Sequence, residues 1–134
     1  MNSRDELSKY LPKHKSDYEN TQYLISLGYP IIEPILPELL EWVQDINWPV
    51  ARLLAPFLIS IGANLKPYII PILHGNDSVW KYWIISSILS PMSEKELIEF
   101  KDPLVDVINN LSESDKLEEV DLAINEILLN RISI

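Results

Sequence analysis

One six-residue segment occurs twice in this chain in nearly the same form. Residues 23–28 read YLISLG and residues 57–62 read FLISIG, at an offset of 34, and a proline-containing apolar stretch follows each copy. A second register, at an offset of 30, aligns residues 47–51 with residues 77–81. Short helix pairs that repeat every 30 to 35 residues or so are typical of an α-solenoid, in which each pair buries its apolar face against the next. The repetition therefore predicts a helical-repeat protein.

Local signals also indicate helices, because apolar residues recur at spacings of three and four and strand-like alternation is missing. Ser3, Ser16 and Ser93 each precede a glutamate by three residues, a pattern typical of a capped helix start. Asn47 and Asp77 precede helical patterns at equivalent repeat positions, so we expect each to cap the helix that follows. The repeat registers also predict a core, whose expected members are Leu24, Leu58, Ile61, Ile70, Leu73 and Ile88.

These patterns predict one all-α domain over residues 1–134. We expect a short right-handed α-solenoid of antiparallel helix pairs, HEAT- or armadillo-like, with about 7–8 helices. Three repeat units and two terminal caps account for the chain. The units are expected at about 17–44, 47–74 and 77–111, and the caps at about 3–10 and 115–132.

Charge and composition exclude several classes of function. The chain has 11 Lys and Arg against 20 Asp and Glu, a net charge of −9 and no cysteine. An acidic surface repels the phosphate backbone of nucleic acids and attracts basic proteins, so we expect a basic protein partner and no nucleic acid. The sequence shows neither a leader pattern nor an uninterrupted apolar run of the ~20 residues that a membrane span needs. We therefore expect a cytoplasmic protein without a membrane partner.

The chain offers little for catalysis. Its two histidines, His14 and His74, lack the spacing of a zinc-binding motif, and it has neither a phosphate-binding loop nor a nucleophile motif. We therefore expect no catalytic residues, no metal and no cofactor, and a function that is not enzymatic. The alternative that stays open is an enzyme or small-ligand binder with a pocket near His14, Asp45 and Trp48.

Polar and aromatic residues near the predicted inter-helix turns are the candidates for partner binding. Asp45, Asn47 and Asp77 would line one edge of the solenoid, although Asn47 and Asp77 also have a structural interpretation as helix caps. Trp42 and Trp48 flank one turn and would either pack in the seam between repeats or anchor a partner. The full set of candidates is Lys13, His14, Asp17, Trp42, Asp45, Asn47, Trp48, Asp77 and Lys81.

Five motifs resemble the pattern of a bacterial family known as domain of unknown function 5071. They are LPKHK at 11–15, GYP at 28–30, LPELLEW at 36–42, DINWPVA at 45–51 and NDSVWKYW at 76–83. The resemblance implies a small bacterial single-domain protein with a HEAT-like fold, and it implies no particular activity. Residues 47–62 and 67–73 are separately similar to the two helices of a HEAT repeat. We therefore expect a protein-binding module, such as a small immunity or adaptor protein for a basic partner.

Overall fold

The computed structural model describes residues 3–132, which form helices and contain no strand. This confirms the predicted all-α class. The helices are α1 (Arg4–Ser8), α2 (Tyr18–Leu27), α3 (Leu36–Glu41), α4 (Pro49–Ile61), α5 (Lys66–Leu73), α6 (Ser78–Trp83), α7 (Glu94–Leu97), α8 (Lys101–Ile108), α9 (Glu113–Leu117) and α10 (Val120–Asn130). Short 3-10 turns extend several of them, and a π-helical segment, Ile84–Leu89, continues α6.

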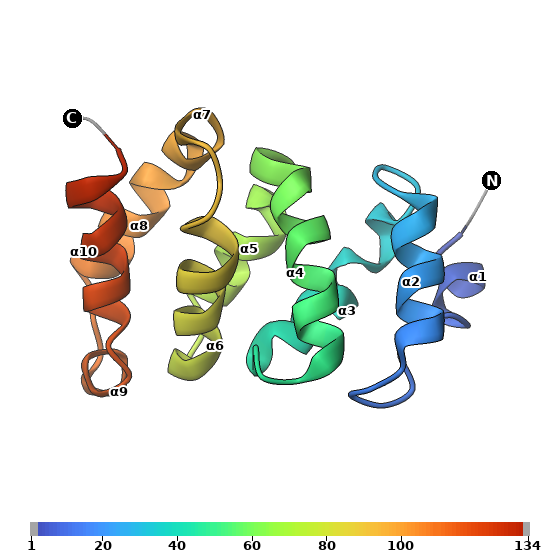
Figure 1. Ribbon diagram of the computed structural model, residues 1–134. Coiled ribbons are helices and arrows are strands. Elements are labelled where there is room, and N and C mark those ends of the chain that lie inside the picture. The colour runs from blue at the N-terminus through green and yellow to red at the C-terminus, as the bar shows by residue number, and fades with distance from the viewer. Residues whose placement is uncertain (1–2, 133–134) are drawn as a thin grey trace.

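The helices lie in two layers, and their order in space follows their order in the sequence (Figure 1). In this view α2, α4, α6 and α10 lie in the near layer, and α1, α3, α5 and α8 lie behind them. Within the near layer α2 packs on α4, α4 packs on the π-helical segment after α6, and that segment packs on α10. In the far layer α5 packs on α8. The first and last helices therefore lie at opposite ends of the molecule.

An apolar core lies between the layers. Five of the six predicted core residues are buried in it, namely Leu24, Leu58, Ile61, Leu73 and Ile88. The prediction for Ile70 is wrong, because this side chain is only half-buried. The rotation of α5 turns Ile69 and Ile72 inward instead.

Helix starts follow the predicted chemistry at three positions. The side chains of Ser3, Ser93 and Asp77 each accept a hydrogen bond from the backbone N–H three residues later, as predicted. The prediction that Ser16 caps α2 is wrong. Asp17, one residue further along the chain, accepts the hydrogen bond from the first turn of α2 instead.

The prediction that Asn47 caps α4 is also wrong. The helix begins at Pro49, and Trp48 occupies the cap position without a side-chain hydrogen bond. Proline favours the first helical position because its φ is already helical and it has no backbone N–H to satisfy. Asn47 therefore lies one residue too early, in the preceding turn, where its Oδ1 accepts a hydrogen bond from Nη2 of Arg52 at 3.2 Å.

One helical stretch, Pro49–Leu73, is long and apolar enough to cross a membrane by length and composition alone. The stretch contains Arg52 and Lys66, so it is not an uninterrupted apolar run, and the expectation of no membrane partner stays a prediction. Gly62 divides the stretch, because its backbone adopts a φ of +67°, a conformation that favours glycine. The chain passes there from α4 in the near layer to α5 in the far layer (Figure 1). Leu58 and Ile69, one from each half, are both members of the core.

Candidate functional site

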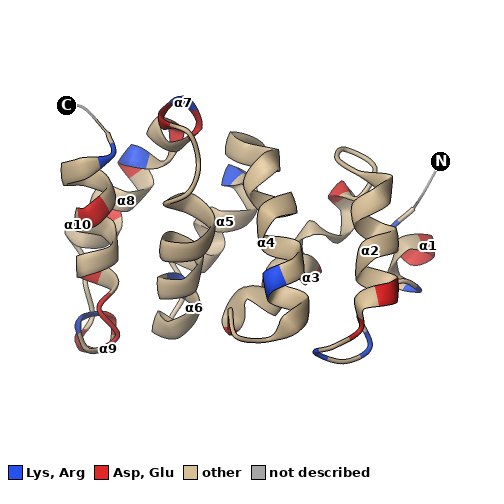
Figure 2. Ribbon diagram, in the orientation of Figure 1, with Lys and Arg blue, Asp and Glu red and all other residues tan. Residues whose placement is uncertain are grey.

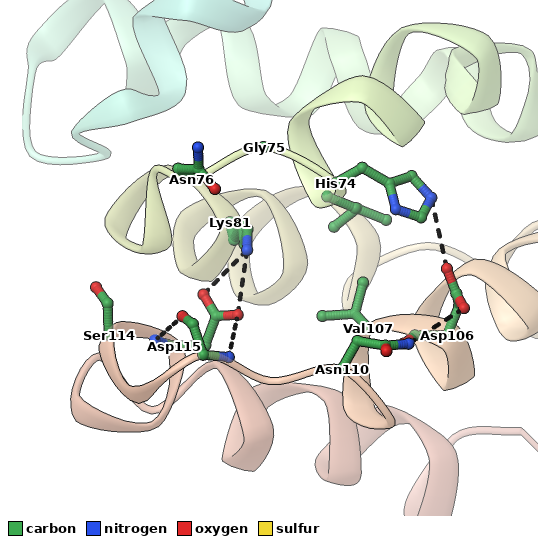
Figure 3. Close-up of a pocket in the computed structure, with 11 residues that line it drawn as sticks. His74, Gly75, Asn76, Lys81, Asp106, Val107, Asn110, Ser114 and Asp115 are labelled. Carbon is green, nitrogen blue, oxygen red and sulfur yellow. Dashed lines mark hydrogen bonds and ion pairs between the residues drawn. The ribbon is translucent and has the colours of Figure 1, made fainter.

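A cavity of about 430 Å³ opens between α5, α6, α8 and α9 (Figure 3). We call it the α5–α9 pocket. Leu73 and Val107, which are both buried, are its apolar side chains. Its polar side chains are those of His74, Asn76, Lys81, Asp106, Asn110, Ser112, Ser114 and Asp115. The pocket therefore combines polar side chains with apolar surface in about equal measure.

A buried ion pair forms one wall of this pocket. Nζ of Lys81 lies 3.0 Å from Oδ1 and 3.1 Å from Oδ2 of Asp115, and the two residues are 6% and 2% exposed. The same carboxylate accepts hydrogen bonds from Oγ of Ser78 at 2.6 Å and from the backbone N–H of Ser112 at 3.2 Å. Burial by itself would raise the pKa of Asp115, but the hydrogen bonds from Ser78, Lys81 and Ser112 outweigh it and lower this pKa. Asp115 is therefore a charged carboxylate at neutral pH.

His74 and Asp106 lie on the opposite side of the pocket from this ion pair (Figure 3). Nε2 of His74 lies 3.7 Å from Oδ2 of Asp106, which is longer than a direct hydrogen bond. Both side chains are about half exposed. Asn110 donates from Nδ2 to the backbone oxygen of Asp106 at 2.8 Å. The Asp106 carboxylate is therefore accessible to a molecule in the pocket.

Sequence reasoning identified Lys81 as a candidate but did not find its partner. The structure places Lys81 in a buried ion pair rather than on an exposed edge. One signal was available, because Asp115 follows Lys81 by 34 residues, which is the offset of the sequence repeat. Residues at equivalent positions of neighbouring repeats are brought close in stacked-repeat folds.

Lys13, His14 and Asp17 lie in the loop before α2. The Asp17 carboxylate accepts hydrogen bonds from the backbone N–H of Lys13 at 2.8 Å and from Nδ2 of Asn20 at 2.9 Å. The hydrogen bond from Lys13 is the main cause that lowers the pKa of Asp17, and the bond from Asn20 adds to it. His14 is exposed, and its Nδ1 accepts from the backbone N–H of Ser16 at 3.2 Å. Asp17 thus has a structural role in ordering this loop.

Trp42, Asp45 and Trp48 meet at the turn between α3 and α4, and all three are half-buried. The rings of Trp42 and Trp48 pack edge to face, with centroids 5.7 Å apart. Oδ1 of Asp45 accepts from the backbone N–H of Asn47 at 2.9 Å, which closes the turn. The segments before α2, α4 and α6, which carry these candidates and Asp77, lie along the same edge of the molecule (Figure 1).

A second hollow surface lies between α6 and α10. Two cavities of about 280 and 230 Å³ adjoin there and share Tyr82 and Glu119. We call this surface the acidic groove, and none of the residues that line it is Lys or Arg. They are Val79, Tyr82, Trp83, Ser86, Ser90, Leu117, Glu118, Glu119, Leu122, Ala123 and Glu126. Figure 2 shows acidic residues in the helices at this end of the molecule.

The groove combines carboxylates with exposed apolar side chains. Within residues 3–132, Glu118, Glu119 and Glu126 form no ion pair. Leu122 is 58% exposed, and Leu129, two helical turns further along α10, is 76% exposed. Leucines that stay exposed next to a hollow, with polar residues around them, are typical of an interaction surface.

Aromatic and hydroxyl groups complete the other wall of the groove. The rings of Tyr82 and Trp83 pack edge to face, with centroids 5.2 Å apart. Oγ of Ser86 is buried and has no hydrogen-bond partner among the described residues. Arg131, which follows α10, does not line the groove, and its guanidinium donates to the backbone oxygens of Ser90 and Met92.

Sequence reasoning missed the acidic groove because it treated residues 115–132 only as a terminal cap. The available signal was the seven-residue spacing of Leu122 and Leu129 beside a run of glutamates. The same apolar stripe would be buried if another helix covered it, so the spacing alone does not separate core from surface.

Comparison with known proteins identifies the chain at the level of a family. A family model described as "Domain of unknown function (DUF5071)" matches residues 10–128. No curated protein matches the chain. The family match agrees with the motifs at residues 11–51 and 76–83.

Proposed function

The chain belongs to this family, and we propose that it is a non-enzymatic protein-binding module that docks a basic, amphipathic segment of a partner protein in the acidic groove. The observation that carries the proposal is one hollow surface in which the exposed Leu117 and Leu122 lie beside three glutamates that form no ion pair among the described residues. The net charge of −9 adds long-range attraction for a basic partner. A small immunity or adaptor protein would use such a surface to cover a basic region of its target.

The two kinds of side chain in the groove contribute in different ways. Glu118, Glu119 and Glu126 would speed the encounter with a basic segment, and salt would screen this attraction. Leu122 and Leu129 would hold the complex together by burial of apolar surface. Because they lie seven residues apart on one helix, they match a partner helix whose apolar residues have the same spacing.

The aromatic wall favours the same class of partner. Tyr82 and Trp83 of α6 line the groove together with Glu118 and Glu119 from the turn between α9 and α10. Lysine and arginine side chains bind favourably over aromatic faces, so a cation in the groove would contact both a carboxylate and a ring.

We further propose that the two layers of helices form a short right-handed HEAT-like solenoid. The support is the repeat itself, since Leu24 of α2 and Leu58 of α4 occupy equivalent positions in YLISLG and FLISIG and are both fully buried. The expected units correspond to α2 with α3, α4 with α5, and α6 with α8, while α10 would close the array. In such an array a surface between neighbouring helices is a natural place for a partner.

A synthetic peptide that carries leucines and lysines at amphipathic helical spacing tests the proposed function. A peptide of identical composition in shuffled order is its control. The variant Glu118→Gln/Glu119→Gln/Glu126→Gln should bind the amphipathic peptide about tenfold more weakly, with a smaller salt dependence. The matched variant Glu94→Gln/Glu99→Gln/Asp102→Asn removes the same charge from exposed positions elsewhere and should bind like the parent.

Apolar contacts are tested separately by Leu122→Ser/Leu129→Ser. This variant should dissociate from the peptide about tenfold faster at every salt concentration. Ile98→Ser, at an exposed apolar position outside the groove, is its control. Equal losses in the groove variants and their controls, or equal binding of the two peptides, would overturn the proposal.

A further inference from the structure

The α5–α9 pocket has no role in the proposed docking, although α9 contributes to both surfaces. Ser112, Ser114 and Asp115 face the pocket, whereas Leu117 and the residues after it line the acidic groove. The pocket volume of about 430 Å³ lies in the range of small-molecule sites. Two charged side chains that are more than nine-tenths buried, Lys81 and Asp115, line it. Buried charges that border an open cavity are typical of a ligand site.

The chemistry of the lining excludes several ligand classes. None of the residues around the pocket is Phe, Tyr or Trp, so the half-exposed imidazole of His74 is the one ring in the lining on which a sugar or nucleobase could stack. Lys81 is the only Lys or Arg that lines it, and its charge is already balanced by Asp115. A phosphorylated ligand would therefore lack the cations that such anions need, and the net charge of −9 would repel it.

Each side of the pocket still offers one charged group to a ligand. An ammonium has three donors, and both hydrogen bonds of Lys81 within residues 3–132 go to Asp115. On the other side, the Asp106 carboxylate is half exposed, and its Oδ2 lies 3.7 Å from Nε2 of His74. The pocket therefore presents the remaining N–H donor of Lys81, whose charge is balanced by Asp115, opposite the negatively charged acceptor of Asp106 (Figure 3).

We propose that the α5–α9 pocket binds a small zwitterion of the amino-acid class. The ligand's ammonium group lies against Asp106, and its carboxylate accepts a hydrogen bond from Lys81. Its carbon skeleton packs on Leu73 and Val107. The net charge of such a ligand is zero, so the acidic surface of the protein does not repel it.

Other groups in the pocket fit this arrangement. The side chains of Asn76 and Ser114 lie on the same side as Lys81 and supply further donors to a carboxylate (Figure 3). Asp115 would repel a second carboxylate if its charge were free. Its oxygens instead accept hydrogen bonds from Lys81, Ser78 and the backbone of Ser112, which spread that charge.

Titration calorimetry with the common amino acids, one at a time at millimolar concentration, tests this proposal. At least one should bind. For alanine, the matched probes are ethylamine, which lacks the carboxylate, and propionate, which lacks the ammonium group. The amino acid that binds most tightly is compared in the same way with the amine and the carboxylate that correspond to it. Each counterpart lacks one charged group and should bind about tenfold more weakly or worse.

Two variants of α8 give a matched comparison. Asp106→Asn removes the carboxylate that faces the pocket and should weaken binding by about tenfold. Asp102→Asn makes the same change one helical turn earlier, at a position that does not line the pocket, and should leave binding unchanged. Loss of binding in both variants, or no binding by any amino acid, would overturn the proposal. The groove variant Glu118→Gln/Glu119→Gln/Glu126→Gln should still bind the amino acid, so the two proposals can fail separately.

Discussion

Nζ of Lys81 in α6 lies 3.0 Å from Oδ1 of Asp115 in α9, and this contact joins two helices across 34 residues of sequence. The carboxylate of Asp115 also accepts from the backbone N–H of Ser112, whose Oγ accepts from the backbone N–H of Asp115. The side chain of Asp115 therefore completes the capping box at the start of α9 and also holds α9 against α6. Because α9 supplies residues to both the pocket and the acidic groove, this ion pair positions both surfaces.

Asp115→Asn should lower the free energy of unfolding by about 3 to 5 kcal/mol. The substitution leaves the ammonium of Lys81 buried without its counter-ion, and an unpaired buried charge is costly. Asparagine keeps an amide oxygen that can accept from the backbone N–H of Ser112, so the change reports mainly on the charge. Urea unfolding followed by tryptophan fluorescence measures the effect.

Two further variants control this measurement. Lys81→Met/Asp115→Leu removes both charges together and should recover most of the lost stability, because apolar replacements of a buried pair are often well tolerated. Asp102→Asn changes an exposed carboxylate and should shift the free energy of unfolding by less than about 0.5 kcal/mol. A loss in Asp115→Asn no larger than that of Asp102→Asn would contradict the structural role of the pair.

Acid should destabilise the fold as the pH drops below about 4. Asp115 and Asp17 both have a pKa in the folded protein that lies below the ordinary value, which is the value in the unfolded chain. Carboxylates of this kind stabilise the fold above the unfolded pKa, and the contribution is lost as the pH falls through the folded pKa. Urea midpoints at pH 7, 5 and 3 should therefore decrease mainly between the last two. In the double variant Asp17→Asn/Asp115→Asn, the decrease of the urea midpoint should be smaller. An equally steep decrease would contradict the role of these two carboxylates in the loss of stability at low pH.

Tyr68 should give the opposite dependence at alkaline pH. Its hydroxyl donates to Oε2 of Glu33 at 2.7 Å, and this bond, with added effects of burial and of the Glu33 charge, raises the pKa of Tyr68 to about 12. Because the folded pKa exceeds the unfolded value of about 10, the stabilisation is complete below pH 10 or so and is lost as the pH approaches 12. Phenolate absorbance should show one late-titrating tyrosine. Tyr68→Phe should remove that step and Glu33→Gln should shift it toward pH 10, whereas an unchanged curve in both would contradict the contact.

The elements of this fold were largely predictable because helix formation and burial depend on local spacing. Leu24 and Leu58 are both buried because they occupy the same place in two copies of one apolar pattern. The rotation of α5 was less predictable, since Ile69 and Ile70 are chemically identical and only packing decides which one faces the core. Asn47 shows a different limit, because Pro49 two residues later overrides its capping tendency and moves the helix start.

The two candidate surfaces were harder to predict, because they depend on contacts between distant segments. Asp115 becomes a wall of the pocket only when α9 packs on α6. Leu122 and Leu129 form an exposed stripe only because no described helix covers that face of α10. The spacing of these leucines was visible in the sequence, but the absence of a covering helix was not.

Asp77→Ala and Asn47→Ala should differ in their effect on stability. Oδ1 of Asp77 accepts a hydrogen bond from the backbone N–H of Trp80 at the start of α6, so its loss should cost about 1 kcal/mol. Asn47 contacts only the exposed side chain of Arg52 through its amide oxygen, so its loss should cost less than about 0.5 kcal/mol. Chemical denaturation of the two variants under identical conditions makes the comparison. Equal costs would mean that position 47 supports α4 in a way that its hydrogen bonds do not show.

Trp42 and Trp48 should stabilise the fold by packing on each other, rather than serve to bind a partner. Edge-to-face packing of two aromatic rings contributes about 0.5 to 1.5 kcal/mol beyond the burial of their area, so a cycle of Trp42→Leu, Trp48→Leu and the double variant should give a coupling energy in that range. Under this interpretation Trp48→Leu leaves binding of the amphipathic peptide unchanged, because the turn before α4 does not line the acidic groove. A coupling energy of zero, together with faster dissociation of the peptide from Trp48→Leu, would instead place the binding surface at the edge that carries Asp45 and Trp48.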